Sequence, residues 1–145
     1  WWDRVWLWQG ATVAALLLAA VLGLQVLVSS FQGAPEGGYL AVIASDDQGL
    51  RLLARHEAGN PTLRLVRTAG AAPEGRVLEL WAIRGDAAPV SLGVLPEDGR
   101  TVIDLPAEFG DAADLTLAVS EEPPGGSTTG APSGEVLAAG SAEEI

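Results

Sequence analysis

The strongest constraint on this chain is an uncharged stretch near its start, because no Asp, Glu, Lys or Arg occurs between Arg4 and Glu36. Its centre, residues 11–28, contains six Leu, four Val and five Ala. As an α-helix this centre would be roughly 27 Å long, and the apolar residues before it can extend the helix to the ~30 Å hydrocarbon core of a bilayer. The sequence therefore predicts a single transmembrane helix over residues 10–30.

The residues before this span predict how it sits in the membrane. Residues 1–9 hold four of the five Trp, and indole rings favour the membrane interface. Arg4 is the only basic residue near the span, and acidic residues follow it, which predicts a cytoplasmic N-terminus and an extracytoplasmic (periplasmic) C-terminal domain on the plasma (inner) membrane. The residues expected to contact lipid as the anchor are Trp2, Trp6, Trp8, Leu16, Leu17, Leu18, Leu22 and Leu24.

Two other interpretations of the apolar stretch agree less well with the sequence. A cleaved signal peptide would have a shorter apolar core and a more basic start than this sequence has. A buried helix of a soluble protein would need the remaining residues to cover it on all sides. The membrane anchor is favoured over both.

The composition excludes most familiar chemistry. The chain has no Cys, no Met and one His, and its eight basic residues are all Arg, which removes disulfides, zinc fingers, thiolate nucleophiles and lysine Schiff bases. Because the net charge of −11 lies entirely from Glu36 onward, nucleic acid is not an expected partner. No cofactor and no metal are predicted.

After a Gly- and Pro-containing linker at residues 31–38, short apolar runs alternate with turn residues. The eight expected strands are residues 39–45, 50–56, 62–68, 76–84, 90–95, 101–105, 115–120 and 136–139. This pattern predicts an all-β domain over residues 39–145, an antiparallel β-sandwich of about eight short strands, with a barrel as the related alternative. Hairpin turns are expected at residues 46–49 and 96–99, and a frayed end at residues 143–145. The core is expected to contain Leu63, Leu65, Leu78, Leu80, Leu115, Leu117 and Val119.

Candidate catalytic groups are sparse. A Ser-His-Asp triad would have to use His56, the one imidazole, but no serine has a nucleophile-elbow pattern around it. We expect His56 to be a surface residue at a strand end, and the chain not to be an enzyme. The acid pairs lack the spacing of a calcium loop. The run at residues 125–130 lacks the Lys of a phosphate-binding loop, and is predicted to be a stiffened crossover loop whose glycines permit positive φ.

Four blocks of sequence, beginning at Leu80, Pro89, Leu117 and Ala131, carry a resemblance. They read LWAI, PVSLGVL, LAVSEEPPGGS and APSGEVL, and in this order and spacing they resemble the C-terminal domain of the anti-sigma-K factor family over about residues 39–140. The Trp-rich start and single span also resemble the membrane segment of that family. The residues taken as the family signature are Trp81, Leu92, Gly93, Ser120, Glu122, Gly125, Gly126, Ser127, Pro132 and Gly134.

The resemblance implies a membrane-anchored regulator of transcription. In such proteins a cytoplasmic domain holds an extracytoplasmic-function sigma factor inactive until regulated proteolysis, first in the outer part and then within the membrane, releases it. The chain has no room for a sigma-binding domain, so we expect it to be a fragment whose sigma-binding part lies upstream of Trp1. Membrane lipid, proteases and other membrane subunits are further expected partners. The alternative function is a single-span accessory subunit of a larger membrane complex, with the acidic β-domain covering its outer face.

Overall fold

The computed structural model describes residues 37–47 and 49–145. The predicted Trp-rich flank, transmembrane helix, lipid anchor and most of the linker lie outside these residues. Within the described part of the chain, no helix has the length and apolar character needed to cross a membrane.

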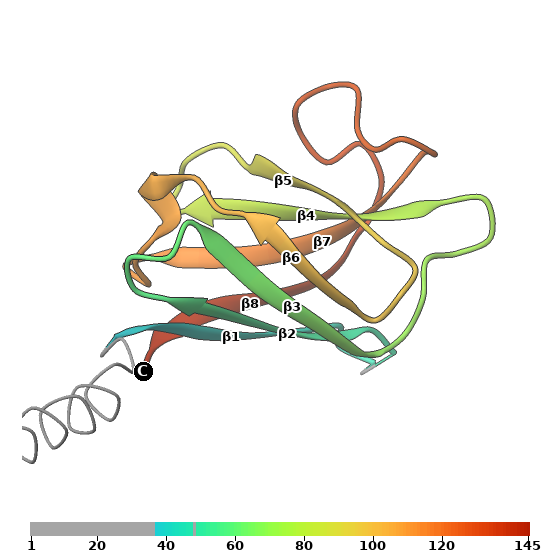
Figure 1. Cartoon of the computed structure of the whole chain (residues 1–145). Helices are drawn as coiled ribbons and strands as arrows, with labels where there is room; N and C mark the ends of the chain where they lie inside the picture. Colours follow the sequence, from blue (N-terminus) through green and yellow to red (C-terminus); the bar gives the residue numbers. More distant parts are fainter. Residues whose placement is uncertain (1–36, 48) are drawn as a thin grey trace, which may run out of the picture. The chain divides into compact units, whose positions relative to one another are not determined.

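The described residues form eight strands and one short 3₁₀ helix (Figure 1). All eight predicted strands are present, mostly within one or two residues of the expected bounds. The strands are β1 (Gly38–Ala44), β2 (Arg51–Glu57), β3 (Thr62–Ala69), β4 (Val77–Arg84), β5 (Val90–Leu95), β6 (Arg100–Asp104), β7 (Leu115–Glu122) and β8 (Val136–Glu144), and the 3₁₀ helix η1 (Ala107–Phe109) lies between β6 and β7.

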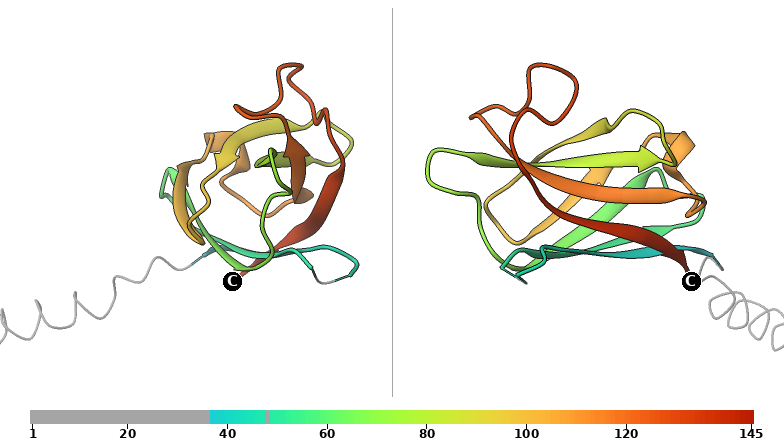
Figure 2. Two further views of the ribbon diagram at one scale, coloured as in Figure 1. Left: turned by 90° about the vertical axis from the view of Figure 1, so that its right-hand side faces the viewer. Right: turned by 180° about the vertical axis from the view of Figure 1, so that it is seen from behind.

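The strands form one sheet, and this corrects the predicted sandwich. The sheet is antiparallel throughout, in the order β5-β4-β7-β8-β1-β2-β3-β6. It curls until its two edge strands approach, so the unit is a nearly closed barrel, seen end-on in the left view of Figure 2. The reason is β8, which pairs with β7 on one side and with β1 on the other. This strand joins what would otherwise be two separate sheets.

The turn at residues 96–99 is a second correction. It connects β5 to β6, but these strands do not pair as a hairpin, because β5 pairs with β4 and β6 pairs with β3. The turn is held to β3 instead. The backbone N–H of Arg67 donates to the carbonyl of Gly99 at 2.6 Å, and its guanidinium donates to the carbonyls of Pro96 and Glu97. The predicted turn at residues 46–49 does connect a paired hairpin, β1 and β2.

The core fills the barrel, and every residue predicted for it is buried. Alternate residues of each strand point inward, as the twofold period of a strand requires. The inner layer is almost entirely aliphatic, with Leu63 and Leu65 from β3, Leu78 and Leu80 from β4, and Leu115, Leu117 and Val119 from β7. Tyr39, Ile43, Leu52 and Phe109 complete it from other elements.

The predicted frayed end is wrong. Glu143 and Glu144 belong to β8, where they pair with Leu40 and Tyr39 of β1, and the N–H of Ile145 donates to the carbonyl of Gly38 at 3.2 Å. Backbone pairing needs no apolar side chain, so the acidic composition of this segment did not reveal the strand.

The close approach of β8 to β1 requires glycine at position 140. A Cβ there would lie 2.0 Å from the carbonyl oxygen of Val42, a backbone atom that cannot move without breaking the pairing. We expect Gly140→Ala to lower the free energy of unfolding by about 3 kcal/mol, the upper part of the usual overpacking range.

The change is measured by urea denaturation of the full chain. Ser141→Ala, at the next and exposed position of the same strand, is the matched control and should stay within about 0.5 kcal/mol of wild type. Equal stability of Gly140→Ala and wild type would contradict the β8–β1 packing.

Candidate functional site

The outer face of β4 and β7 is buried, unlike the outer face of a usual barrel. Leu78, Leu80 and Ala82 point into the core, so the residues that alternate with them point outward. Glu79 and Trp81 are nevertheless only 5% and 0% exposed. Their cross-strand partners on β7, Ser120 and Ala118, are buried as well. Other residues of the chain must therefore cover this part of the outer face.

A chain of hydrogen bonds runs along this buried face. The indole Nε1–H of Trp81 donates to Oγ of Ser120 at 2.8 Å. The hydroxyl of Ser120 in turn donates to Oε1 of Glu122 at 2.6 Å. Each donor is thus satisfied, and the chain ends on a carboxylate with no exposure to solvent.

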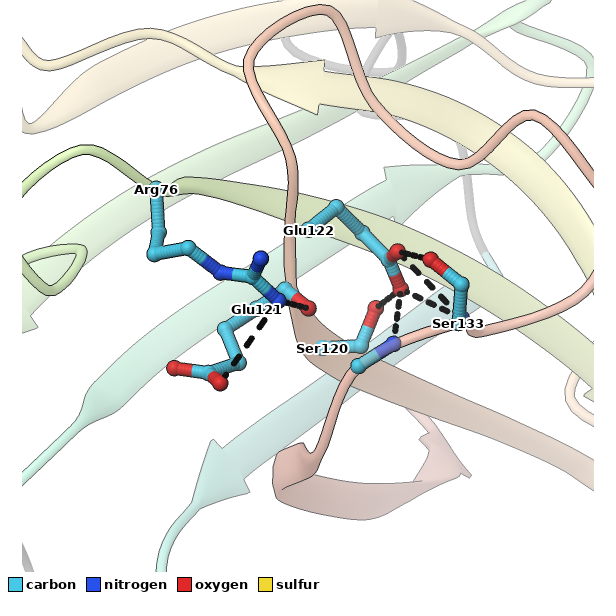
Figure 3. Close-up of polar contacts among 6 residues, drawn as sticks. Arg76, Ser120, Glu121, Glu122 and Ser133 are labelled. Carbon is cyan, nitrogen blue, oxygen red and sulfur yellow. Dashed lines mark hydrogen bonds and ion pairs between the residues drawn. The ribbon is translucent and has the colours of Figure 1, made fainter.

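The carboxylate of Glu122 binds the far end of the β7–β8 loop, residues 123–135 (Figure 3). The backbone N–H of Ser133 lies 3.0 Å from Oε1 and 3.2 Å from Oε2, and the Ser133 hydroxyl donates to Oε2. The N–H of Gly134 donates to Oε1 at 3.4 Å. We call Trp81, Ser120, Glu122, Ser133 and Gly134 the Glu122 clasp.

The clasp determines how Glu122 ionises. Burial by itself would raise the pKa of Glu122, but the hydrogen bonds from Ser120, Ser133 and Gly134 outweigh it and hold the pKa below the ordinary 4.5. Because all these donors favour the charged form, the carboxylate is kept ionised inside the fold without a cationic partner in contact.

A second carboxylate holds the near end of the same loop. Oε2 of Glu79 accepts the backbone N–H of Ser127 at 2.6 Å, and Oε1 accepts the hydroxyl of Ser91 on β5. Gly126 passes so close that a Cβ there would lie 2.9 Å from Glu79 Oε2 and from Val94. Buried acids on β4 and β7 therefore fasten both ends of the loop to the sheet.

Between these attachments the loop is ordered by its own side chains. The hydroxyls of Ser127 and Thr129 both donate to the carbonyl of Ala131. Gly125 and Gly126 have φ of 98° and 93°, so the predicted positive φ is confirmed. The expected crossover is not, because β7 and β8 are adjacent and antiparallel. The loop is an elongated hairpin connection that protrudes from the barrel (Figure 1).

The structure brings most of the predicted signature residues to this place. Trp81, Ser120, Glu122 and Gly134 belong to the clasp, and Gly126 and Ser127 contact Glu79. Gly134 lies against backbone, where a Cβ would come 1.8 Å from the carbonyl oxygen of Glu121. Pro132 is half-buried and Gly125 exposed, both in the loop.

Leu92 and Gly93 have a different position. They form a β-bulge in β5, since Leu80 pairs with Gly93 whereas Trp81 pairs with Ser91, and Gly93 has a φ of 117°. No sequence pattern marked Glu79, Ser91 or Ser133 as residues of the loop attachments. One signal for Glu79 was present in the sequence, because Glu79 is the acid that interrupts the apolar run Val77–Ile83 of β4.

His56 was predicted to be exposed, and this is wrong, because it is 2% exposed. Its Nδ1 lies 3.1 Å from the carbonyl oxygen of Thr62, and its ring lies 5.0 Å from that of Tyr39. Burial raises the pKa of Tyr39 to about 12, with Arg84 lowering it and Asp111 raising it. No serine is a hydrogen-bond partner of His56 among the described residues. These residues also contain no group of three or more His, Asp or Glu placed to hold a metal ion.

Comparison with known families agrees with the resemblance. Residues 10–136 match the family described as "Anti-sigma-K factor rskA, C-terminal". Because the match covers most of the chain, the chain belongs to this family. Anti-sigma factors are regulators and not enzymes. As the family description implies, the binding partner of an anti-sigma factor is a sigma factor. No curated protein and no solved structure matches the chain.

The clasp can be tested by neutralising its carboxylate. We expect Glu122→Gln to lower the free energy of unfolding by about 2–3 kcal/mol, because the amide nitrogen cannot accept the Ser133 and Gly134 donors that it would face. The measurement is the urea midpoint of the full chain, with hydrogen exchange of residues 123–135 as a local readout.

Glu121→Gln is the matched control for that change. Glu121 is the neighbouring acid, and its carboxylate forms only a half-exposed ion pair with Arg76 at 3.7 Å. Pairs of this kind contribute about 0–1 kcal/mol. Equal effects of the two substitutions would show that the Glu122 carboxylate does not fasten the loop.

The lowered pKa of Glu122 predicts how the clasp depends on pH. A depressed folded-state pKa contributes stability that is fully present above the unfolded value of 4.5 and is lost as the pH falls through the folded value. We therefore expect the stability difference between wild type and Glu122→Gln to be constant near neutrality and to shrink below pH 4.5. Denaturation of both proteins between pH 7 and 3 measures this difference.

The pKa of Asp47 is also lowered, by the Ser45 hydroxyl and the Gly49 N–H. Because Asp47 is present in both proteins, its contribution to the pH dependence cancels in the difference. A difference that stays constant to pH 3 would contradict the prediction.

Proposed function

We propose that this chain is the membrane span and outer regulatory domain of a membrane-anchored anti-sigma factor. The observation that carries the proposal is the family match, which begins at residue 10 and so includes the predicted span as well as the strands up to Val136. The acidic barrel, starting at Gly38, follows the predicted span after a linker of only a few residues. The sigma-binding domain would lie upstream of Trp1.

The barrel topology supports a route by which the outer domain controls proteolysis of the anchor region, and with it the release of the sigma factor. β1 directly follows the linker and is held between β2 and β8. β8 in turn starts just after the loop that the Glu122 clasp fastens. Opening the clasp would free the start of β8 from β7. If β8 then separates along its length, as far as the Tyr39–Glu144 pair, β1 loses one neighbour and the unfolded chain extends next to the membrane. Proteases need such locally unfolded backbone, so a folded barrel would protect the anchor region from cleavage.

The test is whether the intact gene product binds a sigma factor. We expect the protein including residues upstream of Trp1 to co-purify with an extracytoplasmic-function sigma factor from detergent-solubilised membranes, and the present chain alone not to do so. Co-migration of the present chain with a large stoichiometric membrane complex, without any sigma factor, would instead favour the accessory-subunit interpretation.

The location of the barrel is tested separately in intact cells. Because the chain has no Cys, single cysteines report on sidedness without background. Asp98→Cys, in the exposed β5–β6 turn, should react with a membrane-impermeant maleimide in intact cells, and Asp3→Cys should react only after lysis. Protection of the Asp98→Cys variant in intact cells would contradict an outer location of the barrel.

A further inference from the structure

One face of this acidic barrel is basic and apolar. It is the part of the outer surface of β1, β2, β3 and β6 that two cross-strand rows form, and Glu57 and Asp104, which alternate with Arg55 and Val102, lie on the same side of the sheet beyond the second row. The first row is Val42, Leu53, Val66 and Arg100, and the second is Leu40, Arg55, Arg64 and Val102, each residue paired in register with the next. We call these eight residues the basic-apolar face.

Its apolar side chains are exposed to an unusual degree. Val42, Leu53 and Val102 are 53%, 37% and 59% exposed. Val42 on β1 and Leu53 on β2 are cross-strand partners, and the partly buried Val66 on β3 lies between Leu53 and β6, the strand of Val102. The exposed apolar side chains therefore form a connected surface and not isolated exposures. A contiguous apolar patch between polar residues is typical of an interaction surface.

The charges on this face are arranged at a cost to the fold. Arg55 and Arg64 are directly opposite each other on β2 and β3, and like charges in that position destabilise a sheet. Arg55 lies 3.6 Å from one acid, Glu57, whereas Arg64 and Arg100 form no ion pair with any described residue. A chain with nineteen Asp and Glu against eight Arg had acids available to balance them. The arrangement therefore fits an anionic partner outside the chain.

We propose that the basic-apolar face docks on the anionic headgroups of the membrane in which this chain is anchored. The face includes β1, the strand that follows the linker, and the linker spans at most about 28 Å when fully extended. The barrel is thereby held at a high local concentration next to the bilayer. The chain as a whole has a net charge of −11 and is repelled by anionic lipid, so a face on which Arg and apolar side chains gather is favoured for the approach. Arg side chains reach the phosphates while Val and Leu enter the interface.

This inference rests on the proposed membrane anchor, and its test separates the two. The full chain is reconstituted into vesicles of neutral phosphatidylcholine, or of phosphatidylcholine with phosphatidylglycerol, and floated on a density gradient. A chain that floats with both lipids has an anchor. One that floats only with the anionic lipid docks without an anchor, and one that floats with neither contradicts both proposals.

Contact of the face itself is read from a polarity-sensitive fluorophore on a single cysteine. With Val102→Cys, on the face, we expect a blue shift and quenching by brominated lipid in anionic vesicles only, reversed by high salt. Thr128→Cys is the control, since the β7–β8 loop projects from the side of the barrel away from β1 and β2 in Figures 1 and 2. It should show neither change.

Removing the opposed charges completes the test. In the Val102→Cys background, Arg55→Gln with Arg64→Gln should lower the ratio of docked to undocked domain roughly 30-fold. The urea midpoint should not fall, because the substitution relieves a like-charge pair. Identical spectra in neutral and anionic vesicles, or a Val102 site that is equally shielded without lipid because another protein chain covers it, would overturn the proposal.

Discussion

The barrel depends on a buried carboxylate that forms no ion pair with any other described residue. The carboxylate of Glu122 is fully enclosed and is stabilised only by hydroxyl and backbone N–H donors. Burying an ionised group is costly unless such donors are in place before the charge is enclosed. The indole N–H of Trp81, through Ser120, and the end of the loop that leads into β8 are both oriented toward that one group, while Glu79 holds the other end of the loop.

Glu122 and β8 together explain why a single sheet forms. β8 must start where the loop returns to β7, and from there it runs long enough to pair with both β7 and β1. The loop attachment and the sheet closure are therefore mechanically linked although they lie on different elements.

Sequence patterns predicted the strands and the core well and the connections poorly. Alternating Leu residues such as Leu78 and Leu80 predict a buried strand face by themselves, because the twofold period of a strand is visible within a few neighbouring residues. The turn between β5 and β6 does not join a hairpin, and its contact with Arg67 of β3 is one between distant positions that no local pattern reveals. The signature around Trp81 and Glu122 was found through resemblance, whereas Glu79 and His56 were missed because nothing in their neighbours marks a polar group as enclosed.

The place of β8 in the sheet has a consequence for biogenesis. It is the last of the eight strands to be synthesised, yet two earlier strands, β1 and β7, need it as their shared neighbour. A chain that is made from its N-terminus must hold seven strands in an incomplete, open arrangement until the final segment arrives. Newly made copies therefore pass through an interval in which aggregation and proteolysis compete with folding.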